Sequence, residues 1–140
     1  MVVEVAGFED VVRDIKALVR EALRRGEAEK EIYETLFEDV TVNSDQEYKE
    51  LVDEDIPSAL RKALEKVGLI CTIYHKREAI SGFEYLANCV TKTGRKMALG
   101  FDVDIREFES IGAGEVELLV GYAARDTEWS PSRLVYYHEV

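Results

Sequence analysis

The fold is indicated first by residues 8–26, FEDVVRDIKALVREALRRG, in which apolar side chains recur at the spacing of an amphipathic helix. Acidic residues near the beginning suit the positive end of the helix dipole, and Arg24 and Arg25 suit the negative end. Gly26 supplies the left-handed residue that commonly ends a helix. The sequence therefore predicts a helix over Phe8–Arg25. Its apolar face consists of Phe8, Val11, Val12, Ile15, Leu18, Val19, Ala22 and Leu23.

A second helix is predicted over residues 27–38, directly after Gly26. Apolar and aromatic residues are spaced there as on one face of a helix, so the two helices would form a hairpin. Residues 39–43 then break the helical period and are rich in β-branched side chains, which predicts a short strand or an extended link. The residues on the apolar face of this second helix are Ile32, Tyr33, Leu36 and Phe37.

A third helix is predicted to begin at the capping-box sequence Ser44-Asp-Gln-Glu47. The Ser44 hydroxyl is expected to accept a hydrogen bond from the Glu47 amide, while the Glu47 side chain reaches back. Pro57 has no amide hydrogen, so it marks either a kink or a fresh start. The apolar period continues to Val67 and ends at Gly68.

The apolar pattern changes to period two from residue 69 onward, as in strands with one buried face. Turn residues separate these strands at 93–94, at 112–114 and at 129–131. Strands joined by such turns predict an antiparallel meander. The predicted strands are Leu69–Lys76, Phe83–Lys92, Arg95–Ile105, Glu115–Ala124 and Arg133–Glu139.

Helices followed by consecutive strands indicate an α+β fold. We expect about three N-terminal helices packed on one face of a curved four- to five-stranded antiparallel sheet. The 140 residues suit one domain, with a helical half at 8–67 and a sheet half at 69–139. A long first helix lying in a curved sheet would leave a pocket between the two. The sequence has no internal repeat and no motif specific to a family.

Acidic residues outnumber basic ones. The chain has 29 Asp and Glu against 18 Lys and Arg, which gives a formal net charge of −11. Nucleic acids and anionic membrane surfaces attract basic faces and would repel this chain. We therefore expect neither nucleic acid nor a membrane as a partner, and we favour a basic protein.

Composition also predicts the compartment. No apolar run approaches the ~20 residues that cross a bilayer, and residues 1–7 lack the basic start of a signal peptide. A cytoplasmic protein is therefore expected. Cys71 and Cys89 are too few for a disulfide scaffold and are predicted to be small core residues. One glutamine and two asparagines in the whole chain are the depletion typical of hyperthermophile proteins.

Candidate pocket residues come from the hairpin around the 93–94 turn. If these two residues are its centre, Tyr85, Asp102 and Asp104 share the face opposite the core. The carboxylates would lie about 6–7 Å apart along one side of a strand, where they could hold a divalent ion through water or act as acid and base. Solvated acids on an acidic protein are the alternative. Tyr122 joins the same wall if the next strand adds to it.

No metal and no cofactor are expected. Cys71 and His75 lie about 13 Å apart along an extended strand, too far for one tetrahedral zinc ion. His138 has no second ligand near it in the sequence. Motifs for an activated nucleophile or a phosphate-binding loop are also missing, and the glycines at 112–114 are interpreted as a simple turn.

The first functional hypothesis is a non-enzymatic binding or regulatory protein whose acidic surface meets a basic partner. The alternative is a small-molecule or catalytic pocket between the first helix and the sheet, lined by Tyr85, Asp102 and Asp104. A third is a metal-dependent nuclease that uses Glu84 with the two aspartates, although the expected lysine spacing is missing. The sequence leaves open whether the protein is an enzyme.

The last predicted strand suggests a way of pairing. Tyr136 and Tyr137 would place one ring on each face of the sheet, and a bulky outward ring suits an interface. We therefore expect a homodimer that forms through the sheet edge.

Overall fold

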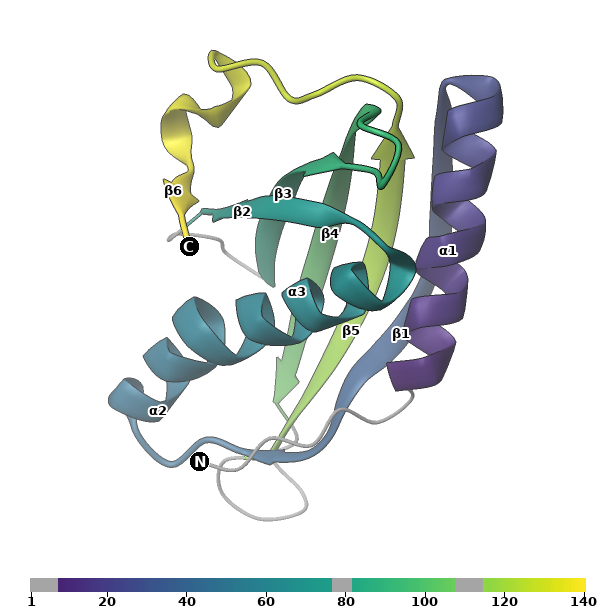
Figure 1. The fold of residues 1–140 in the computed structure, drawn as a ribbon. Helices are drawn as coiled ribbons and strands as arrows, with labels where there is room; N and C mark the ends of the chain where they lie inside the picture. Colours follow the sequence, from purple (N-terminus) through teal and green to yellow (C-terminus); the bar gives the residue numbers. More distant parts are fainter. Residues whose placement is uncertain (1–7, 77–81, 108–114) are drawn as a thin grey trace.

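The computed structural model describes residues 8–76, 82–107 and 115–140 (Figure 1). Two helices, one N-terminal and one of 23 residues, pack against a six-stranded antiparallel open sheet. The strand order is β1-β5-β4-β3-β2-β6. The prediction of an α+β fold with an antiparallel sheet is confirmed, whereas the structure has one helix fewer and more strands than expected.

The elements have the following bounds. The helical ones are α1 (Phe8–Arg25), α2 (Asp45–Glu50), the π-helical turn η1 (Leu51–Asp55), α3 (Ile56–Val67) and the 3₁₀ turn η2 (Arg133–Tyr136). The strands are β1 (Glu27–Thr41), β2 (Ile70–His75), β3 (Gly82–Val90), β4 (Lys96–Glu107), β5 (Glu115–Arg125) and β6 (His138–Glu139). The segments α2, η1 and α3 follow one another directly and form the 23-residue helix.

Helix α1 has the predicted bounds. Val11, Ile15 and Ala22 on its predicted apolar face are completely buried. Gly26 adopts a φ of 97°, and its amide donates to the Ala22 carbonyl at 2.7 Å. Because a positive φ is costly for residues with a side chain, glycine is the residue that ends the helix here.

The predicted second helix is wrong, because residues 27–41 form strand β1, which pairs antiparallel with β5. The pairing runs from Glu27 opposite Arg125 to Thr41 opposite Glu115, and its register shifts at three places. Each such irregularity adds residues and interrupts the alternation of faces. The apolar spacing of β1 therefore departs from period two and resembles that of a helix.

The 23-residue helix begins at the predicted cap. The Ser44 hydroxyl accepts from the Glu47 amide at 3.1 Å, and the Glu47 carboxylate accepts from the Asn43 amide at 2.6 Å. Pro57 cannot donate to the carbonyl four residues before it, and the wider turn of η1 ends two residues before it. The helix therefore continues through Pro57 as one element and ends at Gly68, where φ is 94°.

The loop between β3 and β4 is longer than predicted by one residue. Three residues, 92–94, lie between Thr91 and Arg95, whose amide and carbonyl are joined by a hydrogen bond of 2.8 Å. Gly94 adopts a φ of 84°. A three-residue loop with a left-handed last residue is a common alternative to the two-residue turn, and it moves the register by one position.

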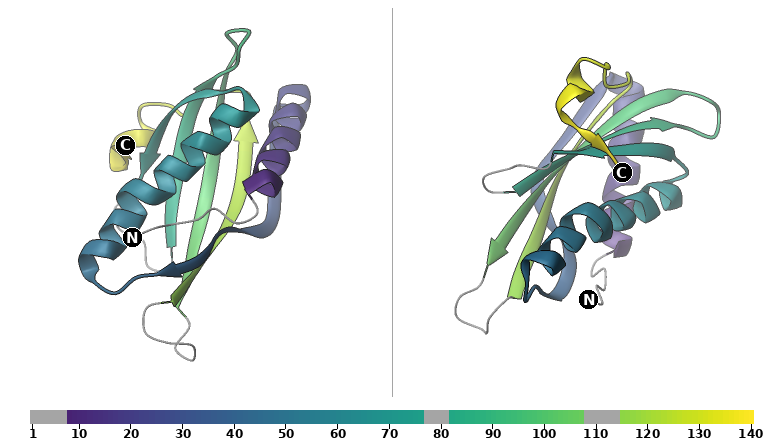
Figure 2. Two further views of the ribbon diagram at one scale, coloured as in Figure 1. Left: turned by 60° about the horizontal axis from the view of Figure 1, so that its bottom comes forward. Right: turned by 90° about the vertical axis from the view of Figure 1, so that its left-hand side faces the viewer.

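This shift exchanges the two faces of β3. Tyr85 pairs with Phe101 on the face that the helices cover, whereas Glu84 pairs with Asp102 on the opposite face. Helices α1 and α3 both lie over the first face (Figure 2) and share one core with it. The large buried side chains of this core include Ile15, Leu60, Leu64, Ile73, Met97 and Leu99.

The beginning of the C-terminal segment, around Trp129, packs on the second face. Trp129 lies against Gly100, and its indole N–H donates to the Leu99 carbonyl at 2.9 Å. Two hydrogen bonds also join the backbone of Trp129 to the side chain of Asn88. The predicted loop at 129–131 is thus confirmed as the connection that leads out of β5.

The predicted last strand, residues 133–139, is mostly wrong. The Ser130 carbonyl accepts from two successive amides, which starts the turn η2, so that only the two residues of β6 pair with β2. Tyr136 is 79% exposed on η2, whereas Tyr137 is buried. The two rings therefore do not flank a strand, and the homodimer stays a prediction.

Cys71 and Cys89 face each other across β2 and β3 and form a disulfide, with Cα atoms 4.1 Å apart. The sequence predicts them as small core residues without a disulfide, because only the register of this hairpin reveals that they are opposite each other. No helix in the described ranges is long and apolar enough to span a membrane. The predicted turn at 112–114 lies outside the described residues.

Candidate functional site

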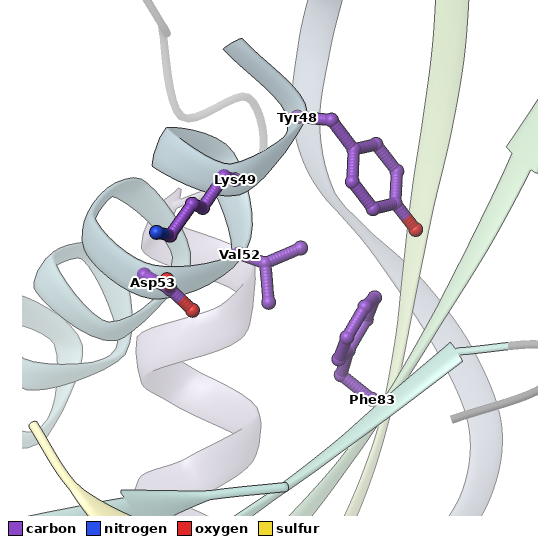
Figure 3. A pocket seen from close by; sticks show the side chains of 5 residues that line it. All are labelled: Tyr48, Lys49, Val52, Asp53 and Phe83. Carbon is purple, nitrogen blue, oxygen red and sulfur yellow. The ribbon is translucent and has the colours of Figure 1, made fainter. Parts of the chain in front are cut away.

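A pocket of about 240 Å³ opens between the start of the 23-residue helix and strand β3 (Figure 3). Its volume equals that of roughly eight water molecules at ~30 Å³ each, so a ligand would have to be small. Its lining divides into two parts in Figure 3, with the rings on one side of Val52 and the charged side chains on the other. The lining residues are Tyr48, Lys49, Val52, Asp53 and Phe83.

The π-helical turn η1 supplies two of these residues and is attached to the sheet. The Tyr85 hydroxyl donates to the Val52 carbonyl at 2.7 Å in the interior of the protein. Burial, together with the charge of Asp53, raises the pKa of Tyr85 above its usual range. The hydroxyl therefore stays protonated and remains a donor, which fixes the depth of η1 against β3.

Asp53 is held from behind by a histidine. His75 Nε2 lies 3.0 Å from Asp53 Oδ1, and the two side chains are 2% and 27% exposed respectively. The His75 ring also stacks on Tyr85, with centroids 5.7 Å apart. Because the imidazole is enclosed and the carboxylate is not, Asp53 is the member of the pair that reaches the pocket.

The other side of the pocket is aromatic. The rings of Tyr48 and Phe83 have centroids 6.1 Å apart and are tilted by 55°. Tyr48 comes from α2 and Phe83 from β3, so this contact joins the beginning of the helix to the sheet. Together with Val52 these rings offer an apolar surface to a ligand.

The structure does not bring the sequence-predicted pocket residues together. Tyr85 and Tyr122 lie under the helices, where Tyr122 meets Phe101 edge-on at 6.0 Å, whereas Asp102 and Asp104 lie on the opposite face. The prediction that Tyr85 shares one face with Asp102 and Asp104 is therefore wrong, because it rested on the two-residue turn, whereas Tyr122 does lie on the same face as Tyr85. Whether any of them binds a ligand stays a prediction.

Asp102 instead belongs to an acidic pair on the second face. It lies opposite Glu84, whose carboxylate accepts hydrogen bonds from Arg133, at 2.8 Å, and from the Tyr137 hydroxyl. Partial burial and the charge of Glu84 raise the pKa of Asp102. Burial and the bond to Glu84 likewise raise the pKa of Tyr137 above its usual range. Among the described residues no group of three His, Cys, Asp or Glu could hold a metal ion.

The sequence interpretation missed every residue that lines the pocket in Figure 3. Two of the contacts that build it join positions far apart in the chain, Asp53 to His75 and Tyr48 to Phe83. One local signal existed, since Pro57 inside an otherwise regular helical pattern indicates an irregular turn shortly before it.

The comparisons with known proteins find nothing similar: no family model, no curated protein and no solved structure matches the chain.

Proposed function

We propose that the protein is a non-enzymatic binding protein that takes a small organic ligand into the pocket between η1 and β3. One observation carries the proposal. A carboxylate, Asp53, is held at the pocket by a buried histidine, and Val52 separates it from two aromatic side chains in the lining. A site whose groups are fixed before the ligand arrives loses little entropy on binding.

The attachment of η1 supports the same proposal. Helices seldom contain a π-helical turn, and such turns are frequent at functional sites. Here the turn is tied to the sheet twice, through Val52 to Tyr85 and through Asp53 to His75. Both bonds are made by residues that line the pocket, so they position groups that a ligand would meet.

A titration followed by ¹H–¹⁵N correlation spectra tests the proposal, with a mixture of small apolar and aromatic fragments at millimolar concentration. We expect shift changes concentrated at residues 48–53 and at 83. Val52→Phe, which fills the pocket, should abolish them. Val135→Phe is the matched control, because residue 135 is 68% exposed and distant in sequence from the pocket lining. Shift changes that are spread evenly, or that survive Val52→Phe, would exclude the pocket as the site.

A second candidate is the binding of a basic protein. The facing pair of Glu84 and Asp102 and the net charge of −11 favour it. A lysine-rich peptide should then bind at low ionic strength and dissociate as salt is added. The same peptide with glutamate in place of lysine is the control, and no binding of the lysine peptide at low salt would exclude this candidate.

The proposed location is the cytoplasm, and the proposed state there is a homodimer. Disulfides are rare in the cytoplasm of most organisms, but hyperthermophiles are an exception. The Cys71 to Cys89 bond and the scarcity of amide side chains are compatible with such a host. Light scattering that finds a monomer at tens of micromolar would exclude the dimer.

A further inference from the structure

The charged half of the pocket limits the chemistry of its ligand, and the inference drawn here rests on the proposed function. Lys49 and Asp53 lie four residues apart, on successive turns of the helix, and both line the pocket. Opposite charges at this spacing often pair. Within the described residues no ion pair under 4.0 Å joins them.

Each charge by itself argues against a singly charged ligand. An organic cation that approached Asp53 would also approach the ammonium group of Lys49. An organic anion that approached Lys49 would meet the Asp53 carboxylate and a protein of net charge −11. An uncharged apolar molecule would cover both groups and supply no partner for either, which costs free energy.

A molecule with both charges satisfies both residues. Its cationic end would lie at Asp53, whose Oδ1 is already oriented by His75, and its anionic end at Lys49. The remainder of such a ligand would lie against Val52, Tyr48 and Phe83, which are apolar or aromatic. Figure 3 shows this division of the lining, with Val52 between the two halves.

The size of the pocket further limits the chemical class of the ligand. A pocket of about 240 Å³ has room for roughly eight non-hydrogen atoms, judged by the volume that each water occupies. An α-amino acid with a branched aliphatic side chain has about this size and carries its two charged groups on one carbon atom. We infer that the pocket binds a small zwitterion with an apolar body, of the chemical class of the aliphatic α-amino acids.

The test uses L-leucine as the probe and three analogues: 3-methylbutylamine, which lacks the carboxylate, 4-methylpentanoate, which lacks the ammonium, and uncharged N-acetyl-leucine amide. Binding is followed by the amide shifts of residues 48–53 and 83. Leucine should bind at least tenfold more tightly than each analogue. Lys49→Met should remove the preference for leucine over the amine, and Asp53→Asn the preference over the acid.

Lys62→Met is the matched control, because Lys62 is an exposed lysine of the same helix and should leave every preference unchanged. Asp53→Asn also alters the partner of His75 and could prevent folding. In that case the result for Lys49→Met decides whether the ligand class is correct, because Lys49 is exposed and its replacement should not affect folding. An amine, acid or amide that binds as tightly as leucine would overturn the ligand class while leaving the pocket as a binding site. Failure of leucine and of the apolar fragments alike would overturn the proposed function as well.

Discussion

Tyr85→Phe removes one hydroxyl group from the interior and leaves the aromatic ring in place. Tyr85 is completely buried, and its hydroxyl donates to the Val52 carbonyl at 2.7 Å. In the variant that carbonyl, at the π-helical turn η1, would lose its donor without gaining access to water. The substitution therefore tests whether η1 is held against the sheet as described.

The magnitude follows from the burial of both partners. A buried acceptor that loses its donor costs about 1–3 kcal/mol, more than the net value of an exposed hydrogen bond. We expect the free energy of unfolding to fall by about 2 kcal/mol. At an unfolding entropy of ~2.1 cal/mol/K per residue, a chain of 140 residues loses about 7 °C in Tm.

Calorimetry at pH 7 measures the shift, and urea titration gives the free energy independently. Tyr136→Phe is the matched control, because Tyr136 is 79% exposed and should change stability by less than about 0.5 kcal/mol. If Tyr85→Phe were as stable as Tyr136→Phe, the hydroxyl would not be buried against Val52. The geometry proposed for the pocket would then be refuted.

Three further substitutions test other parts of the fold. Replacing Cys71 and Cys89 by serine should lower the free energy of unfolding by at most about 3 kcal/mol, as expected for a disulfide that spans 18 positions. The wild type denatured in dithiothreitol should then have the same denaturation midpoint as the double-serine variant. Gly94→Ala should lower the free energy of unfolding, measured by urea titration, by about 1 kcal/mol. The cost comes from the φ of 84° alone, because no atom lies within 4 Å of an added Cβ, and an unchanged midpoint would argue against the three-residue loop. The raised pKa of Asp102 means that its contribution to stability is present below the unfolded value of about 3.9 and is lost as pH rises through the folded value. Asp102→Asn should therefore raise Tm at pH 7 but not at pH 3. The gain in free energy of unfolding should stay below about 1 kcal/mol because Asp102 is exposed, and an equal effect at both pH values would contradict the partial desolvation of Asp102 and its repulsion from Glu84.

Sequence patterns correctly predicted the elements that depend on residues close together in the chain. Helix α1 has one continuous apolar face and a glycine stop, and both the face and the stop are found in the structure. The cap at Ser44 depends on atoms three residues apart and was likewise predicted. For such elements the residues that determine the structure are neighbours in sequence.

Strand β1 and the β3–β4 register were not predictable in this way. The irregular pairing of β1 with β5 conceals its period, and tertiary pairing overrides its helical spacing. In the hairpin, the choice between a two-residue and a three-residue loop around Gly94 reverses which residues are buried. The one-residue difference in the loop places Tyr85 and Asp102 on opposite faces of the sheet, so they cannot line one pocket as predicted.

The pocket escaped prediction for a related reason. Its geometry depends on the contacts of Asp53 with His75 and of Tyr48 with Phe83, and each contact joins two residues more than 20 positions apart in the sequence. No periodicity in the sequence specifies these pairs. These contacts form only once the 23-residue helix has packed on the sheet in its final position.

The central claim is that a ligand occupies the space between η1 and β3, and intermolecular nuclear Overhauser effects test it most directly. With L-leucine labelled with ¹³C in its methyl groups, we predict cross-peaks from those methyls to the ring protons of Tyr48 and Phe83. Cross-peaks confined to residues of α1, or none at saturating leucine, would contradict the account.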